Sequence, residues 1–440
     1  MKKLFFTLVF ISSLLQAQYK VVGTIQESEK YDYAILYKLV GAKQEFVQNT
    51  TIKNGSFYFD FDQSVASGMY RIAYNIKNGG FVDFLYNQED VVFSFDPKDP
   101  VNSILFSKSE ENKLYRKFLS AISYVQYTVD SLQVAYLKMP LESTETLYKQ
   151  AVESIVAVQG TFAKKSAGML VYPFINATNR YNAPAVTKSP NEYLEGIEKH
   201  FFDHIDFENK TLYNSSFLVD RISDYVFYMN SSNDLDTQID LYKKASTKVI
   251  NSIKNTEFKR DVIKFLIGKF ASKKNLVLVD YLFESHFDAL PKDTKNKVFK
   301  EKILSKLRTE TGRIAPDFSW VENGKTNKLS ELNDGENFVL IFWSSSCSHC
   351  TREIPKVYEF LKEKPTIKVI AFAMEDNDVM WKKFIVDLKG WHHALGLNKW
   401  ENETANLYNI SSTPTYFVLD ANKKIIEKPE SVAALKLIFD

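Results

Sequence analysis

Cysteine is scarce in this sequence: the 440 residues include two, Cys347 and Cys350, separated by two positions. So few cysteines exclude a fold held together by several disulfides. A bridge between these two would close a loop of four residues. Such a bridge removes about 2 kcal/mol of chain entropy from the unfolded state, against about 4.7 kcal/mol for a hundred-residue loop. A chain that can bury a large core has little use for it, so the spacing favours chemistry over structural support.

An excess of charge of either sign is also missing. The formal net charge is +2, and Lys2 and Lys3 supply both units, so the rest of the chain is neutral. Basic and acidic residues are interspersed, without the basic stripe that marks a nucleic-acid-binding surface. We therefore expect no nucleic-acid partner. An aromatic content of 14% with few glycines and prolines indicates a folded chain, and the length predicts two or three domains.

A long apolar run is absent beyond the N-terminus, so an integral membrane protein is not expected. At the N-terminus, Lys2 and Lys3 precede the apolar stretch 4–15, and Ala17 ends a tolerable cleavage site. This layout predicts a secretory signal peptide over residues 1–17, with a retained N-terminal anchor as the alternative. A lipoprotein anchor would require a cysteine directly after the apolar stretch, and this sequence has none there. The mature protein is expected in the periplasm or cell envelope.

Three segments differ in their residue patterns. Residues 18–100 contain short alternating runs rich in β-branched and aromatic residues, with Asn54-Gly55 as a hairpin signal, and predict an antiparallel β-sandwich. In residues 101–308 apolar side chains recur every three or four positions, which predicts a helical region, but no chemical motif is evident there. Residues 309–440 alternate buried strands with helices, which predicts an α/β domain. The predicted class is α+β and multi-domain.

The two cysteines lie in the stretch FWSSSCSHCTREIP, residues 342–355. The apolar run 337–342 predicts a buried strand directly before it, so Cys347 is expected to open a helix, where the first N–H groups have no internal partner. A free cysteine has a pKa of about 8.5, and a helix N-terminus favours the thiolate by about 0.3–1 kcal/mol. His349, if protonated, would favour it further. Cys350, one turn later, is expected to lie deeper and to keep its proton longer.

Unequal sulfurs suit thiol–disulfide exchange, in which Cys347 would attack a partner's disulfide and Cys350 would resolve the mixed disulfide. Zinc sites and haem attachment use the same cysteine spacing. A zinc site needs two more ligands, for which the domain offers only the adjacent His392 and His393. Haem attachment needs a histidine directly after the second cysteine, where this chain has Thr351. The sequence therefore predicts a redox site with no metal and no cofactor.

The motif and its surroundings resemble the active site of thioredoxin-fold proteins. Trp343 precedes the cysteines, Pro355 follows them in the expected helix, and Thr413-Pro414 opens a later strand. The start of the domain narrows the resemblance to TlpA/ResA-like thiol–disulfide oxidoreductases. Three stretches carry it: Ala315-Pro316-Asp317-Phe318, Asn323-Gly324-Lys325 and Leu329-Ser330-Glu331-Leu332. More loosely, the β-rich start followed by helices resembles Bacteroidetes-type secreted proteins that carry such a domain at the C-terminus.

The resemblance implies a thioredoxin-like fold for residues 309–440 and roles for single residues. Trp343 would pack beside the cysteines, and Pro355 would kink the helix. The bond before Pro414 would be cis, with the proline lying against the cysteine pair. The backbone of Thr413 would pair with the substrate chain.

Two departures from the family pattern bear on the chemistry. Cytosolic thioredoxins keep a buried aspartate where this chain has Ile341. The TlpA/ResA branch has an acid after the next strand instead, for which Glu375 is the candidate; a solvated loop acid is the alternative. Ser348-His349 stands where the branch usually has Gly or Glu followed by Pro. A histidine there resembles the oxidase DsbA, whose potential is about −120 mV against about −270 mV for thioredoxin, so the motif leaves the direction of electron flow open.

The sequence predicts an exported enzyme, a thiol–disulfide oxidoreductase that acts through Cys347 and Cys350 on protein thiols and disulfides, with reduction favoured. Its own electron donor would be an unidentified membrane protein. One alternative is an envelope protein that uses the thioredoxin fold as a binding scaffold. Another is a copper-handling protein that holds Cu(I) with the two thiolates and a histidine. A peroxidase is disfavoured, because such enzymes usually carry a single peroxidatic cysteine in a different setting.

Overall fold

The computed structural model describes residues 19–26 and 30–440. The signal peptide expected over residues 1–17 lies outside the described residues. The chain forms two compact units, of which the first ends at Phe265 and the second runs from Leu266 to Asp440. Each unit has its own apolar core. Within the described residues, none of the helices combines the length and the apolar character that crossing a membrane requires.

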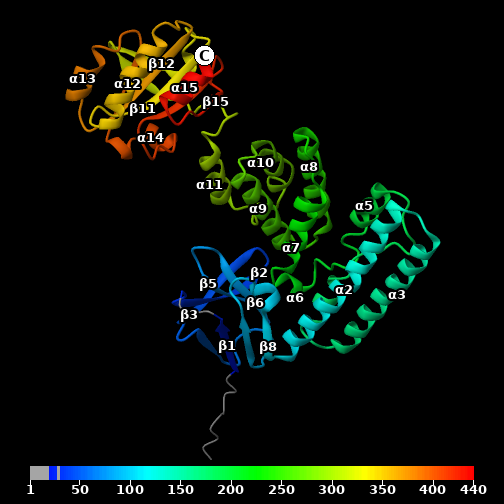
Figure 1. Ribbon diagram of the computed structural model, residues 1–440. Coiled ribbons are helices and arrows are strands. Elements are labelled where there is room, and N and C mark those ends of the chain that lie inside the picture. Colours follow the sequence, from blue (N-terminus) through cyan, green and yellow to red (C-terminus); the bar gives the residue numbers. More distant parts are fainter. Residues whose placement is uncertain (1–18, 27–29) are drawn as a thin grey trace, which may run out of the picture. The chain divides into compact units, whose positions relative to one another are not determined.

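The first unit opens with two four-stranded sheets packed around a shared core (Figure 1), which confirms the predicted sandwich. One sheet has the order β4-β1-β7-β8 and the other β3-β2-β5-β6. Alternate side chains point inward, as in β4, where Phe57, Phe59 and Phe61 are buried and the residues between them are exposed. The strands are β1 (Tyr19–Ile25), β2 (Tyr33–Val40), β3 (Lys43–Thr51), β4 (Ser56–Phe61), β5 (Gly68–Asn75), β6 (Gly80–Tyr86), β7 (Val91–Phe95) and β8 (Leu105–Lys108).

One strand pair departs from the antiparallel arrangement that the sequence predicts. β1 pairs antiparallel with β4 but parallel with β7. Between β4 and β7 the chain crosses to the other sheet, where it forms the hairpin β5–β6. When it comes back, β7 pairs with the side of β1 that β4 leaves free and runs in the same direction as β1. Asn54-Gly55 forms a tight turn with φ values of 48° and 75°, closed by a bridge between Lys53 and Ser56.

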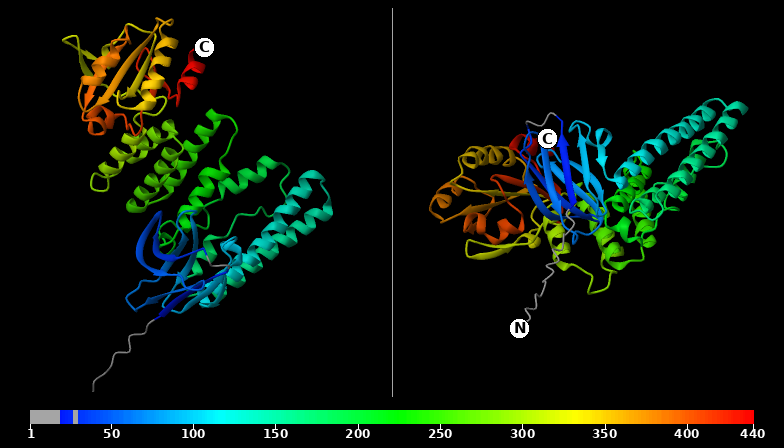
Figure 2. Two further views of the ribbon diagram at one scale, coloured as in Figure 1. Left: turned by 60° about the vertical axis from the view of Figure 1, so that its left-hand side comes forward. Right: turned by 90° about the horizontal axis from the view of Figure 1, so that it is seen from below.

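The helical region predicted after the sandwich is present. Its two longest helices, α2 and α3, run side by side (Figure 1, Figure 2). The helices are α1 (Pro100–Ser103), α2 (Glu110–Lys138), α3 (Glu142–Lys165), α4 (Tyr172–Ala177), α5 (Pro190–Lys199), α6 (Lys210–Tyr213), α7 (Phe217–Ser223), the π-helix η1 (Asp224–Met229), α8 (Leu235–Ser252) and α9 (Thr256–Ser272). α9 spans the junction between the two units.

The second unit begins with α10 (Leu276–Leu282), the π-helix η2 (Phe283–Phe287) and α11 (Lys297–Leu307). The domain boundary expected at 308/309 stays a prediction. A five-stranded sheet of order β13-β12-β11-β14-β15 follows, with the expected thioredoxin-like architecture. β9 and β10 pair in a separate two-stranded sheet. The elements of this domain are β9 (Ser319–Glu322), β10 (Lys325–Lys328), η3 (Leu329–Glu331), β11 (Asn337–Trp343), α12 (Ser348–Leu361), β12 (Ile367–Glu375), α13 (Val379–Ile385), β13 (His392–Leu397), η4 (Lys399–Glu401), α14 (Glu403–Leu407), β14 (Thr415–Asp420), β15 (Ile425–Glu427) and α15 (Val432–Phe439).

The central strand β11 positions the candidate site. Six of its seven residues are buried, because α12 and α15 cover one face of the sheet while β9 and α14 cover the other. β11 runs parallel to β12 and antiparallel to β14. The ends of β11 and β12 therefore meet the start of β14 at one edge of the sheet. The cysteine motif, Glu375 and Thr413-Pro414 follow or precede these strands and come together there.

Candidate active site

Cys347 is the N-cap residue of α12, four positions after the end of β11. Its backbone is extended, with φ −88° and ψ 112°, and its sulfur accepts the backbone N–H of Cys350 at 3.3 Å. A cap satisfies one of the N–H groups that have no partner within the helix. Here the acceptor is a sulfur, so the contact that starts the helix also stabilises a thiolate.

The two cysteines are free thiols in different environments: Cys347 is partly exposed and Cys350 is 0% exposed. Burial opposes ionisation of Cys347, but hydrogen bonds from the thiol and N–H of Cys350 and from the N–H of His349 outweigh it and lower the pKa of Cys347. Burial raises the pKa of Cys350 to about 12, and its hydrogen bond with Cys347 adds to the shift. The two thiols therefore ionise one after the other, with Cys347 first.

Thr413 and Pro414 come from a distant part of the chain and lie against the motif. The peptide bond between them is cis. The thiol of Cys347 lies 3.7 Å from the carbonyl oxygen of Thr413, although 66 positions separate the two residues in sequence. The pairing of β14 with β11 produces this contact. The backbone of Thr413 is thereby held beside the sulfur that ionises first.

Glu375 is a buried acid at the end of β12, with 4% of its surface exposed. Its Oε1 accepts the backbone N–H of Ser345 at 2.5 Å, and its Oε2 accepts the hydroxyl of Ser344 at 3.4 Å. These serines link β11 to Cys347, so the carboxylate holds the loop that carries the motif. The structure therefore places Glu375 in the interior, and the alternative of a solvated loop acid does not describe it.

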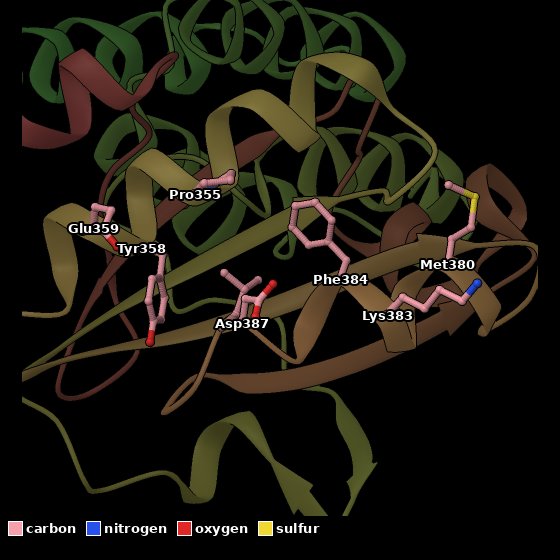
Figure 3. Close-up of a pocket in the computed structure, with 8 residues that line it drawn as sticks. Pro355, Tyr358, Glu359, Met380, Lys383, Phe384 and Asp387 are labelled. Carbon is pink, nitrogen blue, oxygen red and sulfur yellow. The ribbon is translucent and has the colours of Figure 1, made fainter.

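The other residues singled out from the sequence lie in β11 and α12. Trp343 ends β11, is 0% exposed and has its ring centre 5.1 Å from that of Phe384. Pro355 lies inside α12 and lines a cavity of about 520 Å³ between α12 and the segment 380–388 (Figure 3). His349 is exposed on the first turn of α12. Trp343 thus belongs to the same apolar core as Cys350, whereas Pro355 and His349 occupy exposed positions of α12.

The two histidines considered as metal ligands are engaged elsewhere. His392 Nδ1 lies 3.2 Å from the carboxylate of Glu322, and His393 Nε2 lies 2.9 Å from the carbonyl of Leu388. Over residues 19–26 and 30–440, no three His, Cys, Asp or Glu side chains gather in a way that could hold a metal ion.

Known proteins share this domain. Residues 311–428 match the AhpC/TSA family. The chain is similar to thiol-disulfide oxidoreductase ResA of Bacillus thuringiensis subsp. konkukian, with 30% identity over 128 residues that cover 28% of this chain and 70% of that protein. ResA of Bacillus anthracis is 28% identical over 130 residues, covering 29% of this chain and 73% of that protein. The chain belongs to the ResA family of thiol–disulfide oxidoreductases. The resemblance of the sequence to that family is confirmed.

Two solved structures are similar to parts of this ResA-family chain. A domain of a possible thiol-disulfide isomerase from Cytophaga hutchinsonii is 31% identical, covers 29% of this chain and 90% of that chain, and has a TM-score of 0.27. A thioredoxin-like protein from Bacteroides caccae is 15% identical, covers 60% of this chain and 98% of that chain, and has a TM-score of 0.28. The family match begins at residue 311, so the first compact unit of the ResA-family chain lies outside it.

Tyr416 is a neighbour of the site that the sequence did not indicate. It follows Pro414 by two positions on β14, and its ring is buried in the same core as Cys350 and Ile354. Burial raises the pKa of its hydroxyl, and the charges of Glu353 and Cys350 raise it further. The sequence of β14 could have indicated Tyr416, because side chains alternate between the two faces of a strand and every second residue of β14 faces α12. In this member of the ResA family, a tyrosine therefore forms part of the wall around the buried thiol.

Proposed function

We propose that this ResA-family protein is an exported enzyme that exchanges disulfides with protein substrates through Cys347 and Cys350. The supporting observation is the inequality of the two sulfurs. The pKa of Cys347 is lowered, whereas burial raises the pKa of Cys350 to about 12. One sulfur is thus available as a thiolate while the other stays protonated, as a two-step exchange requires.

In the reductive direction, the Cys347 thiolate attacks one sulfur of the client's disulfide, and the client's other sulfur leaves as a thiolate. Cys350 then releases its proton and attacks Cys347 Sγ, so the second client sulfur leaves as a thiolate as well. The client gains two electrons, and the enzyme is left with a Cys347–Cys350 disulfide. A membrane electron donor would return the two electrons. The backbone of Thr413 would hold the client chain, and Glu375 would hold the loop that presents Cys347.

The order of ionisation can be tested by alkylation. Iodoacetamide reacts with thiolates, so the reaction of Cys347 is expected to rise with pH around a midpoint below that of a cysteine in an unstructured peptide, because the pKa of Cys347 is lowered. Cys350 is expected to stay unmodified until the pH approaches 12. Peptide mass spectrometry of the reduced full-length protein after timed alkylation measures both sites. Equal rates at the two cysteines, with the midpoint of an unstructured peptide, would contradict the proposal.

Reduction is the proposed direction, and the potential of the pair tests it. A stabilised Cys347 thiolate favours the reduced protein and so raises the potential of the pair. A protonated His349 would raise the potential further. We nevertheless expect equilibration with glutathione to give a value closer to the about −270 mV of thioredoxin than to the about −120 mV of DsbA. His349→Pro removes both the imidazole and the backbone N–H that bonds Cys347, and a first helical turn tolerates it. The variant is expected to lower the potential by about 30 mV, the equivalent of a tenfold change in equilibrium constant. A value near that of DsbA would reverse the proposed direction.

Export is proposed from residues 1–17, which carry two lysines, an apolar stretch and Ala17 at the end of the cleavage site. The enzyme would then act in the periplasm or cell envelope, where disulfides persist. Mass spectrometry of the N-terminal peptide in envelope fractions is expected to find Gln18 as the first residue. Recovery of the uncleaved chain from the cytoplasm would contradict this location.

A further inference from the structure

A cavity of about 340 Å³ lies in the first compact unit, which the family match does not reach. It opens where α1, α2 and α7 approach β5 and β6. Its volume falls within the range of about 300–1,000 Å³ that is usual for small-molecule sites, and such sites are mostly apolar. Most of the residues that line this cavity are apolar too. They include Phe81, Leu85, Val101, Ile104, Phe106 and Leu119.

Specific contacts hold the walls of this cavity in place. The side chain of Asn112 on α2 donates to the carbonyl of Leu85 on β6 at 2.6 Å and accepts the N–H of Leu85 at 2.8 Å. The guanidinium of Arg71 lies 3.6 Å from the centre of the Phe81 ring. The cavity nevertheless leaves apolar surface in water, because Phe81 is 39% exposed and Val101 is 66% exposed. A ligand that covers these two side chains would remove that surface from water, which is favourable.

The charged side chains that line the cavity are Asp83, Asp220 and Arg116. Arg71 donates two hydrogen bonds of 2.7 Å to Asp83, yet burial still raises the pKa of Asp83. Asp220 forms no ion pair with any of the described residues, and partial burial together with the charge of Asp83 raises its pKa. The guanidinium of Arg116 donates to the carbonyl of Asn102 on α1 at 3.1 Å. Both carboxylates would therefore be stabilised by a positive charge inside the cavity.

We propose that this cavity binds a small organic cation, a protonated primary amine on an apolar body. The ammonium group has three N–H donors and would bond the carboxylates of Asp83 and Asp220. The apolar body would cover Phe81 and Val101, and an aromatic body would also stack on the ring of Phe81. Two carboxylates against one guanidinium line the cavity, so an anionic ligand of the same shape is disfavoured. The site is separate from the cysteine pair and does not depend on disulfide exchange.

Isothermal titration calorimetry of the full-length protein at neutral pH can test this site with three probes. Phenethylamine, phenethyl alcohol and phenylacetate share a phenyl body and carry an ammonium, a hydroxyl and a carboxylate group. Phenethylamine is expected to bind with a dissociation constant of about 1 mM or below. The alcohol is expected to bind about tenfold more weakly, as for the loss of a hydrogen bond to a charged group, and phenylacetate more weakly still. The preference for the amine is expected to shrink at high salt.

Two variants and a control connect this preference to the cavity. Asp220→Asn is expected to weaken amine binding about tenfold and to leave binding of the alcohol unchanged. Val101→Arg places a cation at an exposed position of the lining and is expected to abolish amine binding. Glu153→Gln removes an exposed acid of α3 that does not line the cavity, and is expected to keep the affinity of the wild type.

The inference makes the charge of the ligand decisive, so several results would overturn it. They are equal affinity for the three probes, tighter binding of phenylacetate than of phenethylamine, no binding of phenethylamine, and an amine affinity that Asp220→Asn leaves unchanged. Thermal unfolding of each variant shows whether it is folded. Because Asp220 and Val101 are exposed, we expect unfolding midpoints close to that of the wild type.

Discussion

Replacing Cys347 with serine is expected to lower disulfide exchange by on the order of 10³-fold or more, to the uncatalysed background. A serine hydroxyl does not ionise at neutral pH and cannot form the mixed disulfide through which exchange proceeds. The fold should tolerate the change, because serine is a favourable N-cap and its oxygen can accept the N–H of Cys350 in place of the sulfur. An insulin-reduction assay with dithiothreitol as donor measures the loss.

The neighbouring residue supplies a matched control for this experiment. Ser348→Ala changes an exposed side chain on the first turn of α12 and leaves both sulfurs in place. We expect this variant to keep the activity of the wild type within about twofold, as for exposed positions away from the reacting atoms. If Cys347→Ser and the wild type reduce insulin at the same rate, the reduction is not catalysed by this cysteine, and the proposed function is wrong.

Replacing Cys350 with serine is expected to turn the enzyme into a trap. Cys347 can still attack a client, but no second thiol can then attack Cys347 Sγ, so the mixed disulfide persists. Its lifetime is expected to lengthen to the minutes or hours of uncatalysed disulfide rearrangement. Cells that express the variant should therefore accumulate adducts that run at higher mass on non-reducing gels and disappear on reduction. Mass spectrometry of these adducts identifies the clients.

The double variant Cys347→Ser/Cys350→Ser is the control for this trap. It retains the fold and every surface outside the two sulfur atoms, so partners that bind without covalent chemistry should still be recovered with it. Adducts found with Cys350→Ser and absent from the double variant support exchange. Capture of the same partners by both variants would instead favour the alternative of a binding scaffold, in which the thioredoxin fold carries no activity.

The sequence was most informative where structure depends on near neighbours in the chain. The run 337–342 lies in β11, whose residues after Asn337 are buried, because exposing a long apolar stretch to water is unfavourable. The alternation of Phe57, Phe59 and Phe61 likewise predicted a strand with one face in the core, and β4 has that pattern. The sandwich and the α/β character of residues 309–440 could therefore be predicted from local patterns, whereas the thioredoxin-like fold followed from the resemblance to a known family.

The sequence was least informative about strands with little to bury. β3 reads KQEFVQNTT, and most of its residues are exposed at the edge of its sheet, so it lacks the apolar alternation by which strands are found. The parallel pairing of β1 with β7 was also missed. Pairing direction depends on the path of the chain between the two sheets, and no short stretch of sequence records that path.

In the candidate site, too, some features follow from neighbouring residues in the chain and others depend on the fold. The sequence by itself determined that Cys347 and Cys350 are the two thiols, one helical turn apart and preceded by a buried strand, because these relations lie within fourteen consecutive residues. Only the tertiary structure decided that Glu375 is buried against the serine loop and that Tyr416 packs in the same core as the buried thiol. These residues lie far apart along the chain, and the packing of strands and helices brings them together.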